Sequence, residues 1–113
     1  MALLASEVVY DARLNLQDDK EPYYHTDADL LRYLTSATHR LAGDRPDLLL
    51  TSAGALLVPV AVTTVGDTLI YEADMKEALV HYVCYLALMT DSEDTQNLGL
   101  SREHKAAYVN YIS

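Results

Sequence analysis

The apolar segment of residues 78–89 constrains the fold of this chain more than any other feature. It is apolar at almost every position, and Asp74 and Glu77 precede it as a capping-box-like pair. We therefore predict a helix over residues 74–90 that is apolar nearly all round. Such a helix is buried at the centre of a fold or covered by a neighbouring subunit. The segment contains His81 and is well short of the ~20 residues that span a bilayer, so it indicates no membrane role.

Two more helices are predicted in the first half of the chain, because apolar residues recur there at helical spacing. The first covers residues about 6–16, with Ser6 as its cap. The second covers residues about 27–42 and follows a capping Thr26. A glycine and a proline close the second helix just after its apolar stripe ends.

A β-hairpin and a fourth helix complete the prediction. β-branched residues on both sides of Gly66-Asp67 predict a hairpin over residues about 56–72. An acidic loop follows the central helix, and Ser101 then caps a last helix over residues 101–112. The expected fold is mainly α: a small bundle of about four helices in a single domain, 1–113, with the hairpin inserted between the second and third long helices.

The composition of the chain excludes some classes of function. Seventeen acidic and eight basic residues among 113 give a formal net charge of -9, which repels nucleic-acid phosphates. Cys84 is the single cysteine, so no internal disulfide can form, and a reducing compartment is indicated. The chain is therefore not expected to be a conventional DNA- or RNA-binding module.

The acidic loop does not match a known metal-binding pattern. Residues 91–97 alternate acidic and polar side chains as in a calcium loop, but the sixth position is Gln96 and the twelfth is Arg102, so the EF-hand pattern fails. The four glycines are scattered, so neither a phosphate-binding loop nor a dinucleotide fingerprint can be built from them.

Zinc binding and nucleophilic catalysis are not expected either. His81 and Cys84 lie three positions apart, and His39 or His104 could add a ligand, but no second ligand pair has standard zinc spacing. Nothing places a base beside a nucleophile. We expect no catalytic, cofactor-binding or metal site, and no cofactor, and we do not expect an enzyme.

A series of short segments is recognisable by its order along the chain: 11–13, 23–24, 26–27, 30–34 with Ala37, 45–47, 78–79, 82–83, 91–94, 96–97 and Tyr108. Taken in this order, the segments resemble the head-to-tail adaptor family of tailed bacteriophages, also called connector or head-completion proteins. His25 departs from the family pattern, where Arg or Trp follows the aromatic pair, and so does Ser36, where Asn often precedes the alanine. We also expect the chain to lack the long C-terminal extension with which some relatives embrace the portal.

The resemblance implies a structural virion protein at the neck, made and assembled in the host cytoplasm. Its subunits form a ring, commonly of twelve, that docks beneath the portal protein and offers an attachment site to a downstream neck or tail protein. DNA passes through the lumen without sequence-specific binding, and an acidic lumen would not grip its phosphates.

The resemblance also suggests which residues make contacts. The hairpin would lie against neighbouring subunits, in heterologous contacts that close by rotation. The end of the last helix would face the portal. The expected inter-subunit contacts are Val60, Val62, Leu69 and Tyr71, and the expected portal contacts are Tyr108, Tyr111 and Ile112.

Two other functions stay open at this point. One is a monomeric acidic module that sequesters a basic partner through one strongly acidic face. The other is a small metal-dependent enzyme that uses the carboxylates of residues 91–94, which would require tight binding of a divalent ion.

Overall fold

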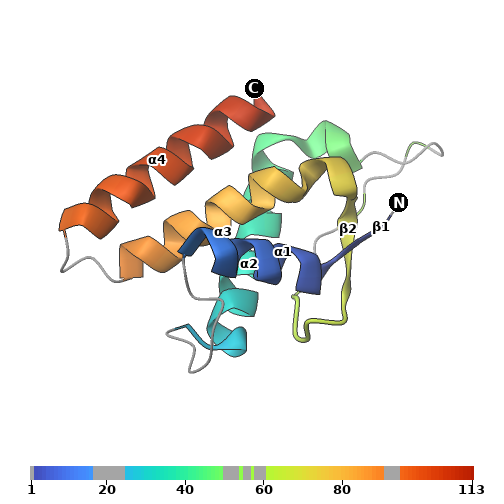
Figure 1. Ribbon diagram of the computed structural model, residues 1–113. Helices are drawn as coiled ribbons and strands as arrows, with labels where there is room; N and C mark the ends of the chain where they lie inside the picture. Colours follow the sequence, from blue (N-terminus) through green and yellow to red (C-terminus); the bar gives the residue numbers. More distant parts are fainter. Residues whose placement is uncertain (1, 17–24, 50–53, 55–56, 58–60, 91–94) are drawn as a thin grey trace.

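The computed structural model describes residues 2–16, 25–49, 54, 57, 61–90 and 95–113 (Figure 1). Its α-helices are α1 (Ala5–Leu16), α2 (Asp27–Asp44), α3 (Lys76–Thr90) and α4 (Thr95–Ile112). The strands are β1 (Ala2–Leu4) and β2 (Thr68–Glu72), and the 3-10 turns are η1 (Pro46–Leu49) and η2 (Ala73–Met75). The predicted fold class is confirmed, since four helices and a small antiparallel sheet make up the fold. None of the helices in these ranges is long and apolar enough to cross a membrane.

α3 is the central helix, and α1, α2 and α4 all pack against it (Figure 1). Side chains on most of its faces are buried, as the apolar segment predicts, whereas the face that carries Glu77, His81 and Tyr85 is exposed or half-buried. The most exposed of its apolar residues is Met89, at the C-terminal end. The buried side chains are Ala78, Leu79, Val80, Tyr82, Val83, Cys84 and Ala87.

α2 begins where the sequence predicts and ends two residues later than predicted, at Asp44, so that Gly43 is its penultimate residue. The hydroxyl of Thr26 accepts a hydrogen bond of 3.1 Å from the amide of Asp29, which satisfies one of the free amides of the first turn. After Asp44 the chain enters η1 at Pro46, which cannot continue an α-helix. The predicted apolar stripe is buried, namely Leu30, Leu31, Leu34, Ala37, Thr38 and Leu41.

The sheet differs from the predicted local hairpin. β2 lies in the predicted segment, but it pairs in antiparallel fashion with β1 at the start of the chain. Residues 61–63, just before the turn, are not in a strand, and residues 58–60 lie outside the described residues. The hairpin over 56–72 is therefore corrected to one strand whose partner is far away in sequence.

The turn at residues 64–67 explains why no local hairpin forms. The carboxylate of Asp67 accepts hydrogen bonds from the amides of Thr63 and Thr64, at 2.9 and 3.2 Å, and so holds this segment in a turn. The carbonyls of Val65 and Asp67 then accept from the amides of residues 6 and 5, at 2.8 and 2.9 Å. The turn thus satisfies the free amides at the start of α1.

α4 begins at Thr95, six residues before the predicted start. Ser101 is therefore inside the helix and does not cap it. Its side chain is buried and donates a hydrogen bond of 3.1 Å to the carbonyl of Tyr85 in α3. Gly99 is also helical, and a side chain there would meet no other atoms. The packing of α4 on α3 extends the helix through a segment whose composition is typical of a loop.

Candidate interaction surface

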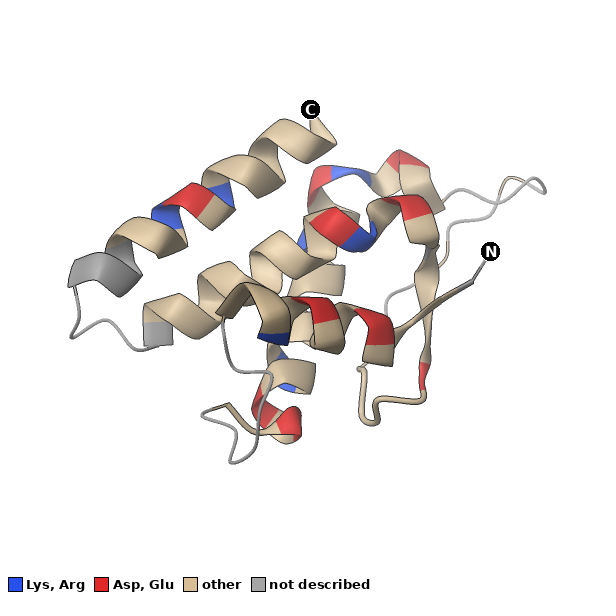
Figure 2. Cartoon of the chain, in the orientation of Figure 1, with Lys and Arg blue, Asp and Glu red and all other residues tan. Residues whose placement is uncertain are grey.

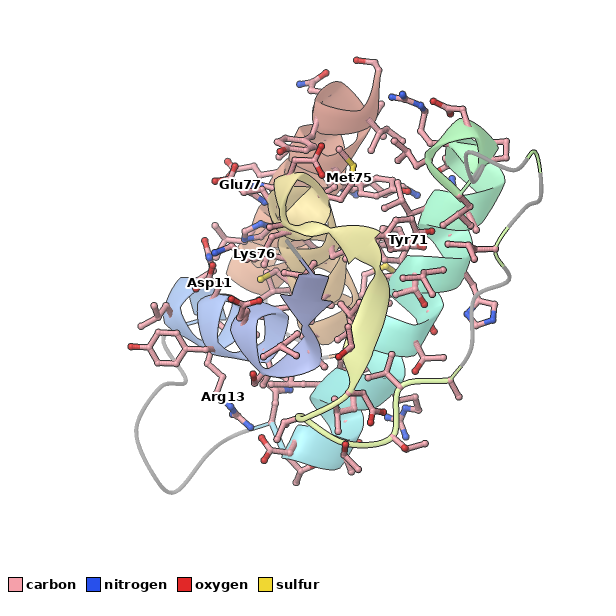
Figure 3. All side chains as sticks on the ribbon, turned by 90° about the vertical axis from the view of Figure 1, so that its right-hand side faces the viewer. Asp11, Arg13, Tyr71, Met75, Lys76 and Glu77 are labelled. Carbon is pink, nitrogen blue, oxygen red and sulfur yellow. The ribbon has the colours of Figure 1, made fainter. Side chains whose placement is uncertain are left out.

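The predicted inter-subunit residues belong to the core of the subunit. Val62, Leu69 and Tyr71 are all buried, and the hydroxyl of Tyr71 donates a hydrogen bond of 2.8 Å to the carbonyl of Thr38. Burial raises the pKa of Tyr71 to about 12. Val60 lies outside the described residues. The prediction is corrected for the three described residues, because their side chains are buried in the subunit's own core and leave little surface for a neighbour; Tyr71 of β2 points toward α2 (Figure 3).

Two of the three predicted portal residues are also in the core. Tyr108 is fully buried, with its ring edge-on to Tyr82 at 5.0 Å between centroids, and Ile112 is buried beside Arg45, which donates to its carbonyl. Tyr111 is 40% exposed, and its hydroxyl donates to the carbonyl of Asp74. Tyr111 is thus the one member of the predicted set that keeps an accessible surface.

A groove of about 440 Å³ lies between α3 and α4. Its apolar lining includes Met89, which is 43% exposed, and its charged lining is Arg102 and Lys105. The Lys105 ammonium lies 4.9 Å from the centre of the Tyr85 ring, in a cation–π contact. We call this surface the α4 groove; its residues are Tyr85, Met89, Ser101, Arg102, Lys105 and Ala106.

The cations of the α4 groove have no ion-pair partner among the described residues, unlike the other described cations. Within the described part of the chain, neither Arg102 nor Lys105 forms an ion pair, although the charge of Lys105 contributes to lowering the pKa of Asp44. The groove is therefore locally positive in a chain whose net charge is -9. The ion pairs elsewhere are Arg13–Asp27, Arg32–Asp29, Arg40–Asp44, Arg45–Asp47 and Lys76–Asp11.

A second surface of mixed character lies on the outer face of α1. Tyr10 and Leu14 are 61% and 45% exposed, although both are apolar. They alternate with Glu7 and Asp11 at the spacing i, i+3, i+4, i+7, which places all four on one face of the helix. We call these four residues the α1 stripe. Figure 2 shows the acidic residues of α1 in red.

The carboxylates of the α1 stripe are held in place from within the subunit. Glu7 accepts a hydrogen bond of 2.9 Å from the amide of Leu4, and Asp11 forms an ion pair of 3.0 Å with Lys76 (Figure 3). The hydrogen bond that Lys76 donates to the Asp11 carboxylate raises the pKa of Lys76. Glu77 lies beside Asp11 at the same surface, so the region stays acidic in spite of Lys76.

The two surfaces lie on different helices, α1 and α4, and both helices pack against α3. α1 packs against α3 through Lys76 and through Cys84, whose thiol lies 3.8 Å from the carbonyl of Ala12. α4 packs against α3 through other residues, among them His81 and Tyr85. α3 therefore lies between α1 and α4 (Figure 1).

Of the four residues considered as zinc ligands, the fold places only two side by side. His81 and His104 meet between α3 and α4, with their Nδ1 atoms 3.0 Å apart. Cys84 is turned toward α1, and burial raises the pKa of its thiol to about 12. His39 is on the exposed face of α2. The described residues contain no group of three or more such ligands, and residues 91–94 lie outside them.

The residues of these two surfaces are not among the predicted contact residues. The alternation of acidic and apolar residues at 7, 10, 11 and 14 is a signal for a helix face that is not part of the core. The α4 groove has no such signal in the sequence, because it forms only where α4 packs against α3.

The sequence matches no protein-family model, and neither a curated protein nor a solved structure is significantly similar to it.

Proposed function

We propose that this protein is a ring-forming head-to-tail adaptor of a tailed bacteriophage. Its ring docks beneath the portal protein, extends the DNA channel and provides the attachment site for a downstream neck or tail protein. The resemblance of the sequence to the adaptor family supports this function, and the mainly helical fold is compatible with it.

The observation that carries the proposal is the pair of exposed, partly apolar surfaces on different sides of α3. A subunit that meets identical neighbours head to tail needs two different surfaces, one for each neighbour, and rings result when the rotation closes. The α1 stripe and the α4 groove meet this requirement. Exposed apolar side chains gathered beside charged ones are typical of interaction sites.

The charge of the chain also suits a DNA channel. A ring of twelve such subunits carries a large negative charge, and a like-charged lumen lets DNA pass without binding its phosphates. The five ion pairs hold most of the described cations at the subunit's own carboxylates, so they are not available to phosphates.

Docking to the portal is assigned to the C-terminal end of α4. Tyr111 and Val109, which are 40% and 47% exposed, are the apolar side chains available there. Tyr108 and Ile112 support this surface from beneath, because both are buried.

The second candidate is a monomeric acidic module that sequesters a basic partner. The net charge and the neighbouring carboxylates of Asp11 and Glu77 favour it. The exposed Tyr10 and Leu14 of the α1 stripe favour the adaptor. Acidic side chains alone are sufficient to bind a basic partner, so that function gives no reason for two apolar side chains to be exposed.

Co-sedimentation with the portal protein encoded in the same genome tests the proposal. The adaptor function predicts that the chain sediments with the portal as a ring-sized complex. A chain that remains a monomer at high concentration and ignores the portal would overturn it. A monomer that instead binds a basic protein would support the acidic module.

A further inference from the structure

We propose that the α1 stripe of one copy docks into the α4 groove of the next copy, and that this contact builds the ring. The inference rests on the proposed function and names its partner surface. The occupant of the groove is thus a helix of a second copy of this chain, held by its exposed side chains.

Charge complementarity between the two surfaces is the first argument. The groove presents Arg102 and Lys105 without ion-pair partners among the described residues. The stripe presents Glu7 and Asp11 with Glu77 nearby, and Lys76 offsets one of these three negative charges. Glu103 follows Arg102 in sequence but points about 100° away around the helix. Opposite charges that meet across an interface guide association and disfavour wrong partners.

The apolar content of the two surfaces is the second argument. The groove is lined by Met89, Ala106 and the Tyr85 ring, and it is large enough, at about 440 Å³, to receive side chains. Tyr10 and Leu14 project from α1 at i, i+4, the spacing by which an amphipathic helix fills a groove. Their burial against these residues would remove both exposed apolar surfaces from water.

The arrangement of the helices is the third argument. Because α3 separates α1 from α4, a subunit cannot place its own stripe in its own groove (Figure 1). The same contact repeated from copy to copy uses each surface once per subunit and leaves none free in a closed ring.

Two variants with complementary charge changes test the inference in the full-length chain. The groove variant carries Arg102→Glu and Lys105→Glu. The stripe variant carries Glu7→Gln, Tyr10→Lys and Leu14→Lys; its Gln retains an oxygen that accepts from Leu4. The matched control is Arg32→Glu, which reverses a cation that is exposed but belongs to neither surface. Circular dichroism and thermal melting verify that each variant is folded.

Assembly is measured by sedimentation velocity, with and without the portal protein. Each variant alone should need at least about tenfold more protein for half-assembly than the wild type, because like charges then face each other. An equimolar mixture of the two variants should restore rings, because each variant's altered surface meets a matching one. Arg32→Glu should assemble as the wild type does.

Two results would overturn the inference while the adaptor function stands: rings that form normally from either variant alone, or variants that fail both alone and when mixed. A wild-type chain that forms no ring under any of these conditions, with portal or without, would overturn the proposed function itself.

Discussion

The hydroxyl of Tyr108 donates a hydrogen bond of 2.8 Å to the carboxylate of Asp44, and so joins the last helix to the end of α2. Asp44 also accepts from Arg40 at 3.0 Å. Burial opposes ionisation of Asp44, but the hydrogen bonds from Arg40 and Tyr108 outweigh it and lower the pKa of the carboxyl. This contact holds the C-terminal half of α4 on the core, and the α4 groove depends on that position.

Removal of the Tyr108 hydroxyl should destabilise the fold. Tyr108→Phe is expected to lower the free energy of unfolding by about 1–2 kcal/mol, since a hydrogen bond to a charged group is lost while Asp44 retains Arg40. Tyr10→Phe removes a hydroxyl from an exposed ring and should change stability by less than about 0.5 kcal/mol. Urea denaturation measures both. Equal decreases in the free energy of unfolding of the two variants would contradict this role for Tyr108.

The pairing of β1 with β2 makes a prediction about two neighbouring leucines. Leu3 is fully buried, whereas Leu4 is 40% exposed. Leu3→Ala should therefore cost about 2–5 kcal/mol of stability and Leu4→Ala within about 0.5 kcal/mol. Denaturation of both variants distinguishes this sheet from a local hairpin over residues 56–72, in which neither leucine would matter. A tolerated Leu3→Ala would support the local hairpin.

The early start of α4 predicts a stabilising substitution. Gly99 is inside the helix with free space around it, so Gly99→Ala should raise the free energy of unfolding by about 0.5–1 kcal/mol. Gly54 has a φ of 85°, and Gly54→Ala should be destabilising by about 1 kcal/mol because alanine strains that conformation. Thermal melting provides the comparison. If Gly99→Ala were neutral or destabilising, the helix would not extend through residue 99.

The contact between His81 and His104 predicts a dependence of stability on pH. Burial lowers the pKa of His104, and the neighbouring His81 lowers it further, while Glu103 raises it. As the pH falls below the ordinary histidine value of about 6.5, the unfolded chain takes up a proton that folded His104 does not. The free energy of unfolding should therefore be at its full value above that pH and decrease below it.

Denaturation curves at about pH 7.5 and about pH 5.5 test this sign, on either side of the ordinary histidine pKa. His104→Gln should make the loss of stability smaller. His39→Gln removes an exposed histidine on α2 and should leave the loss unchanged. A stability that rises toward pH 5.5, or an equal effect of both substitutions, would contradict the role of the pair.

The sequence predicted those elements whose signals are local. Thr26 and the apolar stripe after it mark α2, and the all-round apolar segment marks α3 as the centre of the fold. The partner of β2 could not be predicted, because the strand at the start of the chain pairs across more than sixty residues: Leu4 lies opposite Thr68. The start of α4 depends on packing against α3 through Ser101, which overrides a loop-like composition.

The candidate surfaces were missed for a different reason. Apolar residues such as Leu69, Tyr71 and Tyr108 were assigned to contacts with other subunits, but the subunit's own core uses them. The number of apolar residues in a segment does not reveal which of them face inward. Only the packing of α1 and α4 on α3 shows that Tyr10 and Met89 remain outside.

Native mass spectrometry of the chain mixed with its portal protein tests the central claim most directly. We expect a single complex that contains a defined number of 12.6-kDa subunits, with twelve as the expected number. The chain detected at its monomer mass beside an unoccupied portal ring would contradict it.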